Sequence, residues 1–111
     1  MKIKKLLFAS ALLFSAYNAS AQTQVIAHRG FGKTEGSAQN SIAALLKADS
    51  IGCYGSEFDV WLAADDQLVV NHDPTFKGKR MENSPSTALT AIKLDNGESL
   101  PTLAKYLKAA Q

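Results

Sequence analysis

Several features that would fix a fold or a membrane location are scarce in this sequence. It contains one cysteine, Cys53, so the chain cannot form an internal disulfide. No stretch approaches the roughly 20 consecutive apolar residues that a membrane-spanning helix needs, and no repeat or low-complexity segment occurs. With 111 residues in total, the chain has room for one small domain.

The first 21 residues have the pattern of a secretory signal peptide. Lys2, Lys4 and Lys5 precede an apolar run from Leu6 to Tyr17, and residues 18–21 end in an Ala-x-Ala cleavage pattern. The apolar run is too short to span a bilayer comfortably. We therefore expect a secreted or periplasmic protein without stable insertion into the membrane.

The mature domain, residues 22–111, has almost no net charge. Removal of the signal lowers the number of Lys and Arg residues from 12 to 9 against 10 Asp and Glu, so the formal charge changes from +2 to −1. The basic balance of the whole sequence therefore comes from the signal. Such a domain lacks the basic patch that binding to nucleic acid or to an anionic membrane requires.

Short β-rich runs alternate with helical patterns along the domain. The runs cover residues 24–27, 55–60 and 67–71, and helical spacing extends from Asn40, the expected N-cap, to Gly52. A last helix opens at Pro101, which suits a first helical position. This order predicts an α/β protein with a mostly parallel sheet.

Chemically active side chains follow or lie within the three predicted strands. His28 and Arg29 follow the first strand, and His72 follows the third. Glu57 and Asp59 alternate in the second strand, so both carboxylates point to one face, roughly 7 Å apart along the backbone. Because ligands bind at the carboxyl ends of strands in such sheets, we expect these residues to lie together.

These residue types suit phosphoryl or phosphodiester chemistry. Paired carboxylates favour a hard cation such as Mg²⁺ or Ca²⁺, an arginine grips phosphate with two hydrogen bonds, and histidines exchange protons near neutral pH. Each signal alone has a simpler interpretation, as an exposed ion pair, a surface basic pair or a turn. Their order and their placement at strand ends favour a catalytic interpretation.

Five motifs occur in order along the mature chain: Ala27-His28-Arg29-Gly30, Gln39-Asn40-Ser41, Gly55-Ser56-Glu57-Phe58-Asp59-Val60, Asn71-His72-Asp73 and Leu100-Pro101-Thr102-Leu103. Together they resemble the N-terminal part of the glycerophosphodiester phosphodiesterase family, over essentially all of the mature chain. The resemblance implies a TIM-type (β/α)8 barrel that is incomplete in this chain, because a full barrel needs on the order of 250 residues.

The same resemblance implies roles for individual residues. Glu57 and Asp59 would hold a divalent cation, Mg²⁺ or Ca²⁺, together with an acid from a later strand. His28 and His72 would form the acid/base pair, and Arg29 would contact the phosphate of the substrate.

The family cleaves glycerophosphodiesters, the deacylated remains of phospholipids, into glycerol phosphate and an alcohol. A lysophospholipid or sphingolipid phosphodiester is an alternative substrate class, and a non-catalytic secreted domain that binds a phosphate-bearing ligand or a partner is an alternative function. Gln39 stands where the family usually has Glu, which removes one negative charge. We expect the isolated fragment to be poorly stable and inactive.

Overall fold

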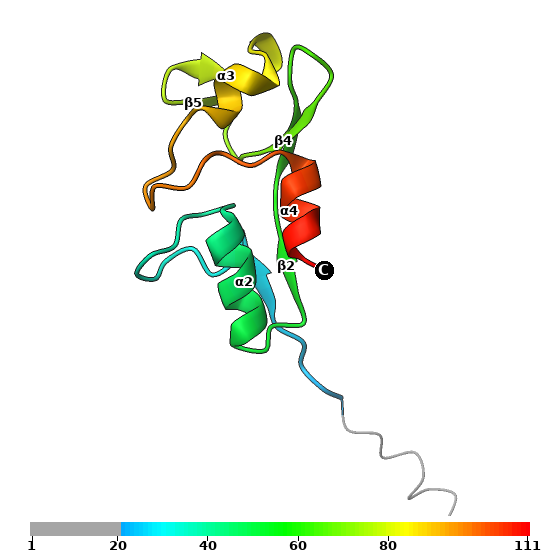
Figure 1. Cartoon of the computed structure of the whole chain (residues 1–111). Helices are drawn as coiled ribbons and strands as arrows, with labels where there is room; N and C mark the ends of the chain where they lie inside the picture. Colours follow the sequence, from blue (N-terminus) through cyan, green and yellow to red (C-terminus); the bar gives the residue numbers. More distant parts are fainter. Residues whose placement is uncertain (1–20) are drawn as a thin grey trace, which may run out of the picture.

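The computed structural model describes residues 21–111, so the predicted signal peptide lies outside the described residues except for Ala21. Figure 1 shows two small α/β units, one above the other, joined by the strand β2, Gly55–Glu57, and its continuation. No helix in this part of the chain is long and apolar enough to cross a membrane. The elements are β1 Ile26–His28, α2 Ile42–Ser50, β2 Gly55–Glu57, β3 Val60–Leu62, β4 Leu68–Val70, β5 Thr75–Phe76, β6 Lys79–Arg80, a 3₁₀ helix at Met81–Asn83, α3 Ser86–Thr90 and α4 Leu103–Ala109.

The first unit is the predicted strand-helix-strand arrangement, in which β1 pairs in parallel with β2. The helix α2 crosses between these strands and buries Ala44 and Ala48. The turn after β1 packs directly on α2 at Gly30, which has a φ of +74°. A Cβ atom at this position would lie 2.6 Å from the Cβ of Ala44, so only glycine fits there.

The prediction of one continuous second strand over residues 55–60 was wrong. The strand β2 ends at Glu57, and the chain resumes as β3 at Val60 with a different partner. Because β2 pairs with β1 while β3 pairs with β4, the chain changes sheets at Phe58 and Asp59. Because of this break, Asp59 takes no part in strand pairing and lies near the loop that follows β1.

The third predicted strand, residues 67–71, exists as β4 but is antiparallel to β3 rather than part of a parallel sheet. Its connection to β3 is a tight turn with Asp66 at a φ of +63°. A parallel pair needs a crossover of a dozen or more residues, whereas a turn this short permits only an antiparallel hairpin.

Two helix starts differ from the prediction. Ser41, not Asn40, is the N-cap of α2, because its side-chain oxygen accepts the N–H of Ala44 at 3.0 Å. Thr102 caps α4 in the same way, so Pro101 precedes the cap instead of opening the helix. The stop at Gly52 is confirmed by its φ of +78° and by its N–H bond to the carbonyl of Asp49.

The main hydrophobic core lies in the second half of the chain, where the β3–β4 hairpin meets α3 and the segment before α4. Trp61 and Phe76 pack against it from the side. Phe76 belongs to the β5–β6 hairpin, which turns at Lys77 and Gly78 and was not predicted from the sequence. The buried members of the core are Ala63, Val69, Met81, Leu89, Ile92, Leu94 and Leu100.

Asp65, in the turn between β3 and β4, fastens this hairpin to α3. Its carboxylate accepts the backbone N–H of Ser86 at 3.0 Å and the hydroxyl of Ser86 at 2.7 Å. The hydroxyl bond to the charged form lowers the pKa of Asp65 below its ordinary value of 3.8. The stabilisation is therefore complete above the pKa of Asp65 in the unfolded chain and disappears as the pH falls through the lower pKa of the folded state.

We expect Asp65→Asn to lower the melting temperature of the chain near pH 6, with a difference from wild type that shrinks as the pH falls below about 4. Thermal melts followed by circular dichroism at several pH values measure this difference. Asp66→Asn, in the same turn, is the matched control, because asparagine tolerates the positive φ found there. A difference in melting temperature that stays constant across this pH range would show that the ionised carboxylate of Asp65 does not stabilise the fold through Ser86.

Candidate active site

Two predicted site residues, one at the end of β1 and one in the turn that follows, converge on an acid at the end of β2. The parallel register pairs His28 with Glu57. The Nε2 atom of His28 lies 3.8 Å from Oε2 of Glu57, and the backbone N–H of Arg29 donates to the same oxygen at 3.1 Å. Arg29 has a positive φ of 58°, so the chain turns directly after this N–H group. His28, Arg29 and Glu57 therefore form one contact group.

Asp59 joins this group through Arg29 and through Asn40. The Nε atom of Arg29 lies 3.9 Å from Oδ2 of Asp59, and the side-chain amide of Asn40 donates to that oxygen at 3.0 Å. Asn40 is 4% exposed, and its backbone N–H donates to the carbonyl of Arg29 at 2.9 Å. Asn40 thus ties Asp59 to the turn that carries Arg29.

Asn40 is a site residue that sequence analysis missed, because it was interpreted as a helix cap. Its φ of 59° is left-handed, a conformation that asparagine adopts more readily than most residues. The position of Asn40 next to Ser41, a second good capping residue, is a signal that one of the two had another role. Its Oδ1 atom is buried without a hydrogen-bond partner among residues 21–111.

The two carboxylates fit part of a site for a hard cation. Within the described residues, their hydrogen bonds and ion pairs use Oε2 of Glu57 and Oδ2 of Asp59, leaving one oxygen of each carboxylate free of such contacts. The side chains are 44% and 28% exposed. No group of three or more His, Cys, Asp or Glu side chains suited to a metal occurs in this part of the chain. Further ligands would have to come from water, substrate or another protein group.

His72 is held at the end of β4 by its neighbours. The buried Asn71 donates its backbone N–H to the carbonyl of Asp59 at 3.0 Å, and the indole N–H of Trp61 donates to the carbonyl of His72 at 3.2 Å. The Nδ1 atom of His72 lies 2.7 Å from Oδ1 of Asp73. Because an ionised carboxylate only accepts, Nδ1 carries the proton in this pair and Nε2 is free to exchange one.

Arg29 and His72 line the same cavity, which has a volume of about 400 Å³. His28 lines a neighbouring cavity of about 280 Å³, and Gln39 contributes to both. The carbonyl oxygen of the Gln39 side chain accepts a hydrogen bond from Nη1 of Arg29 at 2.7 Å. Since Gln39 is neutral, it orients the guanidinium without cancelling its charge.

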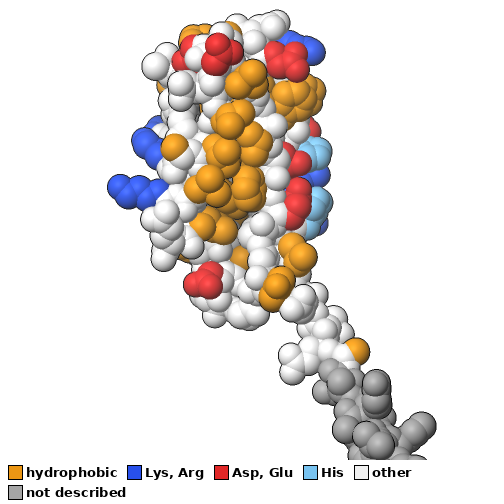
Figure 2. Space-filling model, turned by 90° about the vertical axis from the view of Figure 1, so that its right-hand side faces the viewer, with side chains coloured by type: hydrophobic (Ala, Val, Ile, Leu, Met, Phe, Trp, Pro, Cys, Tyr) orange, Lys and Arg blue, Asp and Glu red, His pale blue; other side chains and the backbone are white. Residues whose placement is uncertain are grey.

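The structure therefore brings four of the five predicted residues into direct contact and links His72 to them through the cavity that it shares with Arg29. Figure 2 shows histidine and acidic side chains gathered along one side of the molecule. The site thus presents imidazole groups that can exchange a proton, the guanidinium of Arg29 and two carboxylates at one surface. This combination suits chemistry on a phosphate diester.

Comparisons with known proteins agree with this chemistry. Residues 28–109 match the model of the Glycerophosphoryl diester phosphodiesterase family. A glycerophosphodiester phosphodiesterase of Caldanaerobacter subterraneus is 48% identical over 54 residues, which cover 49% of this chain and 21% of the relative.

Solved structures show the same relationship at the level of the fold. The glycerophosphodiester phosphodiesterase of Parabacteroides distasonis is 55% identical with a TM-score of 0.79, over 83% of this chain and 39% of that one. A phosphodiesterase of Oleispira antarctica in complex with the product sn-glycerol-3-phosphate is 29% identical with a TM-score of 0.67, over 78% and 39%.

The chain thus spans about two fifths of the length of these solved relatives. Their fold is a TIM-type barrel, and the 91 described residues form an α/β part of it, as the sequence predicts. The family match covers most of the chain and includes every predicted site residue. The chain therefore belongs to the glycerophosphoryl diester phosphodiesterase family.

Proposed function

We propose that this chain supplies catalytic and phosphate-binding residues of an enzyme that hydrolyses glycerophosphodiesters to glycerol phosphate and an alcohol. The observation that carries the proposal is the cavity that Arg29, with its guanidinium held by Gln39, lines together with His72. The relative from Oleispira antarctica, whose structure holds sn-glycerol-3-phosphate, supports this choice of substrate class.

Arg29 is the proposed phosphate-binding residue. Its Nη1 atom is fixed by Gln39 and its Nε atom faces Asp59, so the guanidinium is held before a substrate arrives. Holding a planar cation in advance reduces the entropy lost on binding and favours two parallel bonds to phosphate oxygens. Gln39 leaves the positive charge of the guanidinium available to the substrate.

His28 and His72 are the proposed acid and base. The Nε2 atom of His72, whose other ring nitrogen is held by Asp73, exchanges a proton with the reacting oxygen on one side of phosphorus. The exposed imidazole of His28, beside Glu57, serves the opposite side. One histidine takes the proton of a glycerol hydroxyl as its oxygen bonds to phosphorus, and the other protonates the alcohol whose bond to phosphorus breaks, which leaves a cyclic phosphate. Water then bonds to phosphorus and gives up a proton to one histidine, while the ring oxygen that leaves phosphorus takes a proton from the other.

Glu57 and Asp59 would hold a divalent cation, Mg²⁺ or Ca²⁺, through their uncommitted oxygens. When bound, such a cation neutralises negative charge on the phosphate and orients its oxygens. Asn40 is the proposed positioning residue for Asp59. Its side-chain amide donates to Oδ2 of Asp59, which leaves Oδ1 available to the cation. The signal-peptide pattern supports a secreted or periplasmic location for this reaction.

The proposal is tested with a chimera in which residues 22–111 are joined to the part of the Parabacteroides distasonis relative that this chain does not cover. We expect the chimera to release glycerol phosphate from glycerophosphocholine in the presence of Mg²⁺ or Ca²⁺. Purified residues 22–111 alone are expected to show no turnover, since they lack the later strands of a barrel. Product is measured by a coupled assay for glycerol phosphate.

The unmodified relative is the positive control for the assay. A folded chimera that binds the cation but releases no glycerol phosphate would contradict the proposal. Turnover by purified residues 22–111 alone would contradict the expectation that the fragment is inactive.

A further inference from the structure

The candidate active site opens into two cavities with a common wall. Arg29 and His72 line the larger cavity, of about 400 Å³, and His28 lines the smaller one, of about 280 Å³. Each proposed acid/base residue therefore lines a cavity of its own. The residues that line both cavities, and so form the wall, are Gly32, Lys33 and Gln39.

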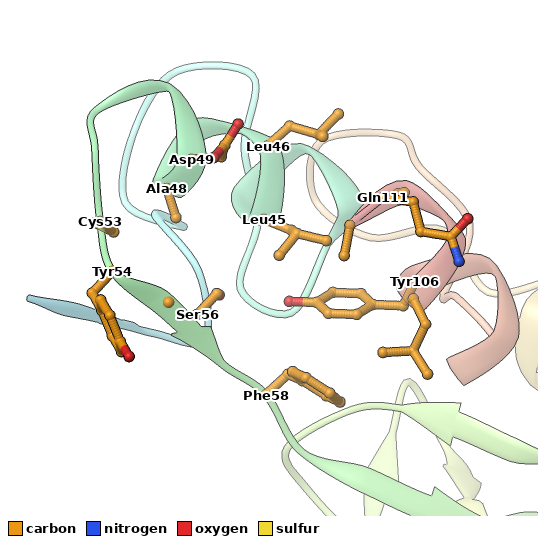
Figure 3. A pocket seen from close by; sticks show the side chains of 14 residues that line it. Leu45, Leu46, Ala48, Asp49, Cys53, Tyr54, Ser56, Phe58, Tyr106 and Gln111 are labelled. Atoms are coloured by element: carbon orange, nitrogen blue, oxygen red, sulfur yellow. The ribbon is translucent and has the colours of Figure 1, made fainter.

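Another cavity, of about 570 Å³, lies away from these two. Figure 3 shows Leu45 of α2 and Tyr106 of α4 beside it, together with Phe58. No candidate site residue lines this cavity, and none of its lining residues is basic. A negatively charged diester is therefore expected in the two cavities that share a wall.

The backbone fixes the position of this wall. A Cβ atom on Gly32 would lie 2.9 Å from both the N and the Cα atoms of Gln39, so no side chain fits between these two segments. The N–H of Phe31 donates to the carbonyl of Ala44 in α2 at 2.9 Å. Lys33, which directly follows Gly32, is thus anchored at the boundary between the cavities.

Lys33 is the basic residue of this wall. The ion pairs within residues 21–111 do not include it, since their basic members are His28, Arg29, His72, Lys77 and Arg80. Arg29, by contrast, is held by Gln39 and Asp59. The ammonium group of a lysine is a compact charge on a flexible stem, so Lys33 can reach a charged group of a ligand in either cavity.

The smaller cavity carries charge of one sign. Lys33 is among its lining residues, and no carboxylate is. Asp73 and Asp95, by contrast, line the larger cavity. Because like charges placed together at a binding surface are unfavourable, the smaller cavity disfavours a positively charged group and accepts a neutral or negatively charged one.

The departing alcohol of the proposed reaction is expected in the smaller cavity. The side chain of His28 is 74% exposed and that of His72 is 45% exposed, so the side of His28 is the more open to solvent and permits release. A volume of about 280 Å³ equals that of about nine water molecules in the liquid, which is room for a small alcohol such as glycerol.

We propose that Lys33 is a specificity-determining residue, which favours diesters whose departing alcohol is neutral or anionic over diesters of cationic alcohols such as choline. The inference rests on the proposed function, because it concerns the alcohol that this reaction releases. Lys33 lies beside the alcohol and not at the reacting phosphorus, so it changes the relative rates of different substrates.

The test compares two diesters in the chimera described above. Glycerophosphoglycerol carries a neutral alcohol and glycerophosphocholine a cationic one, and the measured quantity is the ratio of their kcat/KM values. We expect Lys33→Glu, which reverses the charge, to shift this ratio toward glycerophosphocholine at least about tenfold. Lys33→Met keeps the length of the side chain and removes only the charge, so it should shift the ratio by about threefold. Added salt should reduce both shifts.

Lys105→Glu is the matched control. It makes the same change of charge at an exposed position of α4 outside both cavities, and a glutamate in the first turn of a helix is well tolerated. It should leave the ratio unchanged. An unchanged ratio in Lys33→Glu, or an equal shift in Lys105→Glu, would overturn the proposal.

Binding gives a second measurement that does not depend on turnover. Calorimetry on the His72→Ala chimera yields the Kd of each diester, with and without Lys33→Glu. A shift of the ratio of Kd values toward glycerophosphocholine in Lys33→Glu supports the proposal even if the unmodified chimera releases no glycerol phosphate, a result that counts against the proposed function alone. The same ratio with and without Lys33→Glu, or no binding of either diester, would overturn the proposal.

Discussion

Replacement of His72 by alanine in the chimeric barrel is expected to lower turnover of glycerophosphocholine at least about a hundredfold, the low end of what general acid/base catalysis contributes. The reason lies in the pair with Asp73, which holds Nδ1 at 2.7 Å and leaves Nε2 free to exchange a proton in the cavity that Arg29 lines. The measurement is the steady-state rate across a range of pH values, with circular dichroism to check folding.

Two further variants separate chemistry from packing in this prediction. Asp73→Asn keeps the size of the side chain but weakens its hold on the His72 ring, so we expect a smaller loss of turnover and a shifted pH profile. Asp95→Ala is the control, because Asp95 lines the same cavity but contacts neither His72 nor Asp73 and is 93% exposed in its side chain. A near-normal rate for His72→Ala would exclude the acid/base role of this residue.

The sequence predicts that the candidate site residues lie together, because their signals are local. A histidine or an acid at the end of a β-rich run lies at one edge of such a sheet, and the structure brings His28 and Glu57 into contact there, with Arg29 in the turn that follows. His72 lines the same cavity as Arg29 although β4 is antiparallel to β3, because the hairpin returns His72 to the same side of the molecule.

The parts that the sequence did not reveal depend on partners far away in the chain. The run 55–60 has a uniform β-rich pattern, and only its pairing with β1 on one side and β4 on the other divides it at Phe58 and Asp59. The sequence predicts a polar turn around Ala64-Asp65-Asp66. A turn this short permits only an antiparallel connection, so the prediction of a parallel neighbour for residues 67–71 was wrong.

Asn40 and Gln39 show the same limit at the site itself. Each residue has a common local role, in a helix cap or a loop, and their functional contacts reach Asp59 and Arg29 across the fold. The β5–β6 hairpin was missed because its turn uses Lys77 before Gly78, where Asn or Asp would have given a clear signal.

The metal assignment predicts that Mg²⁺ or Ca²⁺ raises the melting temperature of the chimera and that Glu57→Gln with Asp59→Asn abolishes this rise. A ligand at 100 times its Kd stabilises the folded state by about 2.7 kcal/mol. In a domain of barrel size this stabilisation corresponds to a rise of roughly 5 to 10 °C. The amide variants keep the shape of both side chains and remove the negative charge that holds the cation, so turnover should also fall at least about a hundredfold.

A matched double variant shows whether loss of these two particular acids, rather than loss of two negative charges, removes the effect. Asp66→Asn with Glu82→Gln changes the net charge by the same amount at two positions outside the candidate site. It should leave the cation-dependent rise intact, because long-range effects between exposed charges are screened beyond about 10 Å at 0.1 M salt. If the rise survives in Glu57→Gln with Asp59→Asn, the cation is held elsewhere. The carboxylates of Glu57 and Asp59 would then serve only as ordinary ion-pair partners of His28 and Arg29.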